Sequence, residues 1–264
     1  MDTLKEGSRG GEVMLLQRRL AAKGFSPGEP DGIFGPGTEA AVLAFQRSEG
    51  LGVDGIVGRE TAAVLEFTEN ELPIAEGMPE VTVPIAAKMA PGAPLGNIKS
   101  NLPIILDALR STELTTKPIV LTALATVRVE TGRFAPISEF LSRFNTSPGG
   151  QPFDLYDFAK DLGNNAKGAG ARYKGRGFVQ LTGKFNYQQF GQEVGVDLIG
   201  DPEKANDPQI ASRLLAAFLK AKRARIEQAL RVGDFADARK AVNGGSHEVD
   251  QFTDSYKTGL QLLS

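Results

Sequence analysis

The sequence contains no cysteine and a single histidine, His247. Without cysteine the chain can form no disulfide, thiol nucleophile or thiolate metal site. One imidazole disfavours zinc peptidases and amidases, which need several histidine ligands, and leaves a Ser-His-Asp triad only one possible base. No apolar run approaches the roughly 18 residues that predict a membrane span. These absences direct attention to chemistry carried by carboxylates and amides.

The composition is that of a globular protein with real hydrophobic cores. Hydrophobic residues make up 41% of the chain and charged residues 23%, and the formal net charge is −2. A charge balance this close to zero gives no global attraction to nucleic acid or anionic lipid. We therefore expect no nucleic-acid partner, no stable membrane insertion and a monomer. The segment Met1–Gly7 has no apolar core of a signal peptide, so we expect none.

A turn-and-helix pattern occurs twice near the N-terminus. Residues 31–43 read DGIFGPGTEAAVL and residues 54–65 read DGIVGRETAAVL, an offset of 23 positions (54 minus 31). Each Asp-Gly pair predicts a turn, because glycine adopts positive φ at little cost. Thr38 and Thr61 lie near the predicted helix starts, where threonine often caps. Two copies are too few for a solenoid.

A further amphipathic helix precedes the first copy. Val13, Leu16 and Leu20 follow helical spacing, and Gly24 is expected to end that helix. Together with the two repeats, this predicts a small three-helix domain over residues 1–67.

The motifs of this region resemble the peptidoglycan-binding domain found at one end of many wall hydrolases. The motifs are LKEGSRG over 4–10, VxxLQxxL over 13–20, DGIFG over 31–35 and AFQ over 44–46. The resemblance covers residues 3–66 and implies that the module binds peptidoglycan. We expect its glycan contacts at the two turns, which contain Asp31, Gly32, Phe34 and Asp54.

Residues 68–99 are rich in proline and glycine, which interrupt helical periodicity, so we expect a linker there. Helical patterns resume beyond it and strand-like alternation is scarce. The remaining residues, 100–264, are expected to form a larger, mostly α domain. The predicted fold class is therefore mostly α throughout.

The segment 117–132 predicts a buried helix that ends in an acidic residue. Pro118 suits its first turn and Gly132 its C-terminal stop. Glu130 would lie at the end of an apolar helix, close to unpaired carbonyls. Desolvation and the negative helix end both disfavour a carboxylate there, which predicts a raised pKa and a protonated carboxyl. That is the state a general acid needs.

Glu139 follows in the next segment. Pro136 suggests a new helix start, which would place Glu139 among backbone N–H groups that favour its charged form. A neutral and an ionised carboxyl side by side form the pair that glycoside hydrolysis uses. Two glutamates at this spacing are common, so the pair alone leaves its function open.

Three motifs in the second half resemble family 19 glycoside hydrolases, which include chitinases and related phage endolysins. They are ETG over 130–132, RYKGRGFVQLTGKFNY over 172–187 and AVNGG over 241–245. The resemblance implies a larger lysozyme-like or chitinase-like helical domain in which Glu130 is the general acid. It implies that Glu139 is the base that activates water, and that Thr182 helps hold that water. The implied substrate contacts are Tyr173, Lys174, Arg176, Gln180, Asn186, Tyr187 and Asn243.

Two departures from the family pattern put chitin in doubt as the substrate. The residue before the acid glutamate, often histidine in relatives, is Val129 here. The tail after Gly245 has no arginine where many chitinases have one, and Gln251 is the nearest candidate.

The favoured function is hydrolysis of β-1,4 bonds in peptidoglycan glycan strands, with N-acetylmuramidase specificity, as in a modular phage endolysin. No metal or organic cofactor is required. Resemblance to family 19 implies inversion, which demands carboxyl groups about 6.5–9.5 Å apart. The alternatives are a chitinase with a wall-binding module, a non-catalytic wall-binding protein and, less favoured, a wall peptidase. The expected route is synthesis in the host cytoplasm and action in the periplasm once the membrane is breached.

Overall fold

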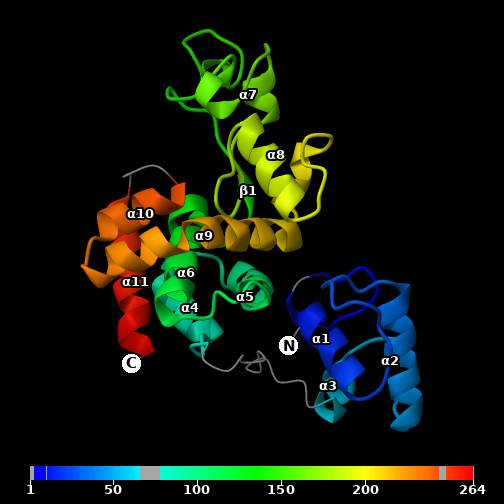
Figure 1. The fold of residues 1–264 in the computed structure, drawn as a ribbon. Helices are drawn as coiled ribbons and strands as arrows, with labels where there is room; N and C mark the ends of the chain where they lie inside the picture. Colours follow the sequence, from blue (N-terminus) through cyan, green and yellow to red (C-terminus); the bar gives the residue numbers. More distant parts are fainter. Residues whose placement is uncertain (1–2, 10, 66–77, 244–247, 264) are drawn as a thin grey trace.

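The computed structural model describes residues 3–9, 11–65, 78–243 and 248–263. It is mostly helical and has two hydrophobic cores, one built from residues 4–65 and one from residues 78–256. Figure 1 shows α1 to α3 grouped apart from the larger body that holds α4 to α11. The predicted fold class is confirmed.

The small domain consists of α1 (Gly11–Ala22), α2 (Pro36–Ser48) and α3 (Arg59–Val64). Each Asp-Gly turn leads into a helix, α2 or α3, so the predicted repeat of turn and helix is confirmed. The capping prediction for Thr38 and Thr61 is wrong. The N-cap residues are Gly35 and Gly58, and no side-chain hydrogen bond caps either helix. The hydroxyls of Thr38 and Thr61 instead accept hydrogen bonds from buried glutamines.

Residues 78–99 belong by packing to the larger domain, although the sequence predicted a linker there. Met78 and Val81 are buried in the larger core, and α4 (Val83–Met89) follows them. Pro84 lies in the first turn of α4 and Pro94 is the N-cap of α5 (Leu95–Ser111), so these prolines begin helices rather than break them. The rest of the predicted linker, 68–77, lies outside the described residues. We propose that the second domain begins near residue 78.

The larger domain is organised around α6 (Lys117–Thr131), which is buried on all sides from residue 119 to residue 127. Against it pack α4, α9 (Pro208–Arg231) and α11 (Val249–Leu262), and α10 (Phe235–Asn243) packs on α9 and α11. The segment between α6 and α9 forms a separate lobe, seen at the top of Figure 1. Its elements are β1 (Ile137–Ser138), η1 (Asp154–Tyr156), η2 (Lys160–Leu162), α7 (Ala169–Arg172), β2 (Arg176–Gly177), α8 (Lys184–Glu193) and η3 (Pro202–Asn206).

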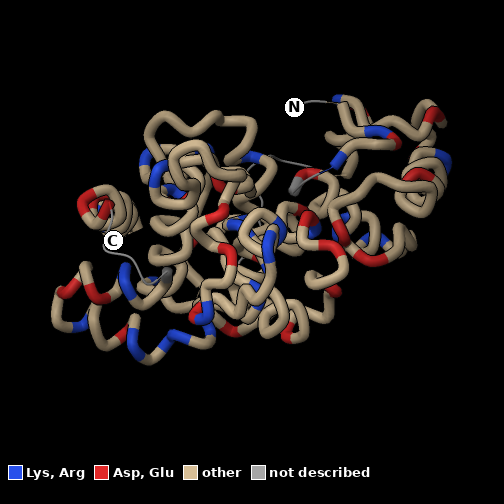
Figure 2. Tube along the Cα trace, turned by 90° about the horizontal axis from the view of Figure 1, so that it is seen from above, with Lys and Arg blue, Asp and Glu red and all other residues tan. Residues whose placement is uncertain are grey.

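The two domains touch through α1 and α5. Arg18 on α1 forms an ion pair with Asp107 on α5. The Gln209 side-chain amide also donates to the Asp31 carbonyl, at 2.8 Å. Figure 2 shows basic and acidic positions of both signs spread over both domains. In the described part of the chain, no helix is both long and apolar enough to cross a bilayer.

Candidate active site

Glu130 occupies the last turn of α6, as the sequence predicted. Pro118 lies in the first turn of this helix, and Gly132 ends it in the left-handed conformation at φ 62°. A left-handed residue just after a helix is most easily a glycine, because a side chain there is strained. The sequence Glu-Thr-Gly therefore fixes where the helix stops and places the carboxyl at its end.

The Glu130 carboxylate is paired with Arg239, which comes from α10. The two groups lie 2.7 Å apart, and their side chains are 9% and 3% exposed. Arg239 precedes the AVNGG motif, whereas the sequence-based expectation concerned the tail after Gly245. Burial disfavours a charged carboxyl, but an adjacent guanidinium favours it, so the two effects oppose each other. The raised pKa predicted for Glu130 from burial and the helix end stays a prediction, to which the ion pair with Arg239 adds an opposing influence.

Glu139 is not in a helix, contrary to the prediction drawn from Pro136. It directly follows β1, which pairs antiparallel with β2 so that Ser138 faces Arg176. The Glu139 N–H donates to the Gly175 carbonyl at 2.8 Å, which extends the pairing by one residue. The antiparallel pairing of β1 with β2, rather than a helix N-terminus, thus positions this carboxyl.

Three donors hold the Glu139 carboxylate. The Asn145 amide and the Tyr156 hydroxyl donate to Oε1 at 2.9 and 2.8 Å, and the Gly175 N–H donates to Oε2 at 3.1 Å. Burial, followed by the neighbouring carboxylate, raises the pKa of Tyr156, so its hydroxyl stays a donor. A carboxylate, which only accepts hydrogen bonds, matches three donors. The sequence did not predict these roles for Asn145 and Tyr156, because short irregular segments carry no periodic signal.

Gly175 allows the close approach of this loop to Glu139. A Cβ at position 175 would lie 3.2 Å from Glu139 Oε2 and 2.8 Å from Gln180 Oε1. Both distances are shorter than ordinary van der Waals contact, so a side chain here would displace the carboxylate or the amide.

Arg176 holds the lobe together and is not free to contact substrate. Its side chain is 3% exposed and forms an ion pair with Glu203. Nη1 donates to the carbonyls of Arg172 and Lys174 and to the Tyr187 hydroxyl, at 2.9, 3.3 and 2.9 Å. The prediction of a substrate contact at Arg176 is therefore wrong.

Tyr173 and Tyr187 pack together in the core beneath this motif. Their ring centroids lie 5.5 Å apart, and the rings are 6% and 0% exposed. The Tyr187 hydroxyl donates to the Lys174 carbonyl at 2.7 Å, and burial raises its pKa to about 12. The expectation that Tyr187 presents its ring to a sugar is wrong, since it has no exposed surface.

The other predicted contacts are half-buried and bonded to the backbone. The Gln180 amide donates to the Ile137 carbonyl at 3.0 Å, and the Thr182 hydroxyl donates to the Gln180 carbonyl at 2.8 Å. The Asn186 amide donates to the Thr182 carbonyl at 2.8 Å. Lys174 Nζ lies 5.1 Å from the centre of the Phe153 ring. Asn243 ends α10, and its side chain lies outside the described residues.

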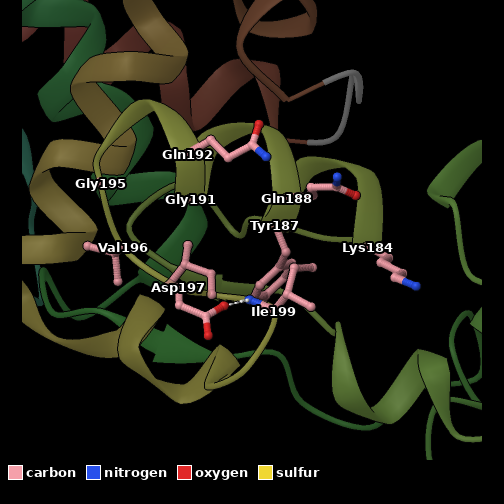
Figure 3. Close-up of a pocket in the computed structure, with 10 residues that line it drawn as sticks. Lys184, Tyr187, Gln188, Gly191, Gln192, Gly195, Val196, Asp197 and Ile199 are labelled. Atoms are coloured by element: carbon pink, nitrogen blue, oxygen red, sulfur yellow. Dashed lines mark hydrogen bonds between the residues drawn. The ribbon is translucent and has the colours of Figure 1, made fainter.

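A cavity of about 580 Å³ lies beside α8 and contains neither proposed catalytic glutamate. Lys184, Gln188 and Gln192 line it from one face of α8, and the loop 195–199 closes the other side (Figure 3). Of the predicted substrate residues, Tyr187 alone borders it.

The wall-binding module contains the same buried network twice. In the first copy the Gln17 amide donates to the Asp31 carboxylate at 2.9 Å and to the Thr38 hydroxyl at 3.0 Å. Gln17 Oε1 accepts from the Gly32 N–H at 2.9 Å. These bonds lock the turn, so the residues that repeat in sequence are those that shape it.

The second copy repeats these bonds. The Gln46 amide donates to Asp54 at 2.8 Å and to Thr61 at 3.2 Å. Bonds from the Ile56 N–H and the Gln46 amide lower the pKa of Asp54. Phe34 is 1% exposed and belongs to the core, so its predicted glycan contact is wrong. Asp31 and Asp54 lie at the surface, but their carboxylates accept hydrogen bonds that stabilise the turns.

The structure shows a helical protein with two domains, each with its own hydrophobic core. Comparison with known families agrees. Residues 9–65 match the family model of the putative peptidoglycan binding domain, and residues 149–226 match that of chitinase class I. The chain therefore joins a peptidoglycan-binding domain to a family 19 glycoside hydrolase domain. The second matched range contains the Thr182 motif but begins after both glutamates.

Individual relatives cover one domain each. The spore cortex-lytic enzyme of Bacillus cereus is 44% identical over 62 residues, which are 24% of this chain and 24% of that protein. Chitinase 12 of Oryza sativa subsp. japonica is 54% identical over 35 residues, 13% of this chain and 11% of that one. The chain thus spans about a quarter or less of the length of these curated relatives.

A solved bacterial family 19 chitinase shares the fold. It aligns with 70% of this chain and 95% of its own length, with a TM-score of 0.50 and 22% identity.

Proposed function

We propose that the chain hydrolyses β-1,4 glycosidic bonds of peptidoglycan, with N-acetylmuramidase specificity favoured. The observation that carries this proposal is the contrast between two carboxyl groups. Glu130 is nearly buried beside Arg239. Glu139 instead accepts hydrogen bonds from three donors, and it follows the strand β1, which pairs with the strand β2 of the family motif. The peptidoglycan-binding domain supports the choice of polymer.

In this proposal the two glutamates act on opposite sides of the scissile bond. Glu130 gives a proton to the bridging oxygen, and Glu139 takes a proton from the attacking water, which Thr182 helps to hold. The reaction would invert the anomeric carbon, which requires carboxyl groups about 6.5–9.5 Å apart. The three donors on Glu139 fix the direction of its carboxylate, as a base requires.

We assign Arg239 a positioning role. Its guanidinium fixes the direction of the Glu130 carboxyl and limits how strongly burial can hold a proton there. Its Nε and Nη1 atoms are buried and have no hydrogen-bond partner among the described residues. A buried guanidinium with one anionic partner would be left as an uncompensated charge without that partner. Replacement of either Glu130 or Arg239 should therefore affect the other.

The substrate is tested by digesting purified sacculi and purified chitin separately with the full chain. We expect soluble fragments with new reducing ends from sacculi, and mass spectrometry should identify N-acetylmuramic acid at those ends. Faster release from chitin would favour the chitinase alternative. New amino groups without new reducing ends would overturn glycosidase activity, and no release from either polymer would favour a non-catalytic wall-binding protein.

We further propose that a monomer is made in a bacterial cytoplasm and reaches peptidoglycan after the inner membrane is breached. This follows from the location of the proposed substrate outside that membrane. Expression in a Gram-negative host should cause lysis only when the membrane is permeabilised. Lysis without permeabilisation would contradict this route.

A further inference from the structure

Exposed apolar side chains are concentrated in the lobe that holds Glu139. Phe140 and Phe144 are 75% and 73% exposed, the two highest values among the large apolar residues of the described chain. Exposed apolar surface that gathers at one place marks a binding site more often than scattered single residues do. Both rings lie in the loop that begins with the proposed base.

Hydrogen bonds of Asn145 close this loop and connect its backbone to Glu139. Asn145 is fully buried, and its amide donates to the Phe140 carbonyl at 2.8 Å and to Glu139 Oε1 at 2.9 Å. Its Oδ1 accepts from the Ser142 N–H at 2.9 Å. Phe140 follows Glu139 in the chain, and Phe144 precedes Asn145. The Cα atom of each phenylalanine therefore lies about 3.8 Å from the Cα atom of a residue in the hydrogen bond between Asn145 and Glu139. Both phenylalanines thus belong to the closed loop that also contains the proposed base.

Arg143 adds a positive charge to the same loop. Its guanidinium carbon lies 4.9 Å from the centre of the Phe144 ring. Among the described residues, no acidic side chain forms an ion pair with Arg143. The acids of the following loop are engaged elsewhere, since Asp154 accepts from Ser147 and Asp157 from the N–H groups of 168 and 170. The charge of Arg143 is thus available to a ligand.

We propose that Phe140, Arg143 and Phe144 form a subsite for a sugar that carries an anionic peptide. Aromatic surfaces with a few placed polar groups are typical of ligand sites, and the apolar face of a pyranose fits such a ring. A guanidinium binds a carboxylate through two parallel hydrogen bonds. Peptidoglycan stem peptides carry carboxylates and chitin carries none. The subsite therefore selects peptidoglycan, an inference that rests on the proposed function.

The test compares glycan strands that carry stem peptides with the same strands after a carbodiimide and ammonia have converted the stem-peptide carboxylates to amides. Arg143→Gln is expected to lower kcat/KM on strands with free carboxylates about tenfold, as loss of a charged hydrogen bond does, and to leave amidated strands unaffected. Phe144→Ala should slow both substrates. Arg231→Gln, which alters an exposed arginine at the end of α9, is the matched control and should change neither.

Binding to the inactive Glu130→Gln background separates this inference from the proposed function. In that background, adding Arg143→Gln should weaken affinity for peptide-bearing strands about tenfold and not for strands whose stem-peptide carboxylates are amidated. Equal affinity for peptide-bearing strands, or equal losses on both substrates, would overturn the subsite. Loss of binding to phosphatidylglycerol vesicles in Phe140→Ala/Phe144→Ala, with cleavage unchanged, would also overturn it and indicate a membrane contact. Inactivity of the wild-type chain on both strands would overturn the proposed function alone.

Discussion

The Arg239 guanidinium lies 2.7 Å from the Glu130 carboxylate and joins the end of α6 to α10. Both side chains are nearly buried, so water would not solvate either charge if its partner were removed. An intact buried pair contributes little net stability, but removal of one partner leaves an uncompensated charge in the interior. The proposed acid is therefore coupled to the packing of a helix that is distant in sequence.

Replacing Arg239 should damage both stability and activity. Arg239→Gln is expected to lower the free energy of unfolding by about 3–5 kcal/mol, because the buried Glu130 loses its counterion. Urea denaturation measures this change. The double variant Glu130→Gln/Arg239→Gln should be more stable than Arg239→Gln alone. A single variant as stable as the wild type would show that the pair is not buried as described.

Removing one donor from Glu139 should slow the reaction and leave the fold intact. Tyr156→Phe deletes a hydrogen bond to a charged group, worth about 1.5–3 kcal/mol, so kcat/KM should fall about 10- to 100-fold. Release of reducing ends from sacculi measures the rate, and circular dichroism checks the fold. Tyr256→Phe, at a buried tyrosine of α11, is the control. Equal rates in the two variants would contradict the assignment of Glu139.

The close approach at Gly175 predicts a strong effect from one added methyl group. Gly175→Ala would place a Cβ 3.2 Å from Glu139 Oε2 and should lower activity at least about tenfold by moving the carboxylate. Gly96→Ala, in α5, has nothing within 4 Å of the added atom and should behave as the wild type. Comparable activity of both variants would mean that the 175 loop does not set the position of Glu139.

The repeated glutamine network should stabilise the wall-binding module. Gln46→Leu removes the partner of the Asp54 carboxylate and of the Gly55 N–H, and each buried group left unsatisfied costs about 1–3 kcal/mol. We expect a smaller fraction of the protein to co-sediment with sacculi, and a lower melting temperature for this domain. Arg47→Leu, at the neighbouring exposed position on α2, should retain both properties. Normal melting of Gln46→Leu would show that the network is dispensable.

Alkaline conditions should destabilise the catalytic domain. Burial raises the pKa of Tyr187 to about 12, whereas an unfolded tyrosine titrates near about 10. The unfolded chain therefore releases this proton first, so the contribution of Tyr187 is present below about pH 10 and is lost as the pH rises toward 12. Urea midpoints across this window should fall less steeply in Tyr187→Phe than in the wild type. Parallel slopes would contradict the role of Tyr187.

The sequence was most informative where local geometry follows from residue type. Gly132 predicted the end of α6 and hence the place of Glu130, and the repeated Asp-Gly turns predicted the starts of α2 and α3. Pro136 misled, because proline also suits the approach to a short edge strand, and the pairing of β1 with β2 is a long-range contact.

The partners of the two glutamates could not be predicted from sequence. Arg239 and Tyr156 reach the site through tertiary packing, and neither the AVNGG motif after Arg239 nor the short segment around Tyr156 indicates a contact with a glutamate. The roles of Arg176 and Tyr187 were misjudged for a related reason. A motif identifies residues needed for a site but does not separate those that touch substrate from those that hold the backbone behind it.

The acid role of Glu130 is tested most directly by the rate at which Glu130→Gln releases reducing ends from purified sacculi. The substitution keeps the size of the side chain and removes its proton-donating carboxyl. We expect the rate to fall about 10²- to 10⁴-fold, the usual contribution of a general acid, while the protein remains folded and still binds sacculi. A rate near that of the wild type would contradict the proposed mechanism.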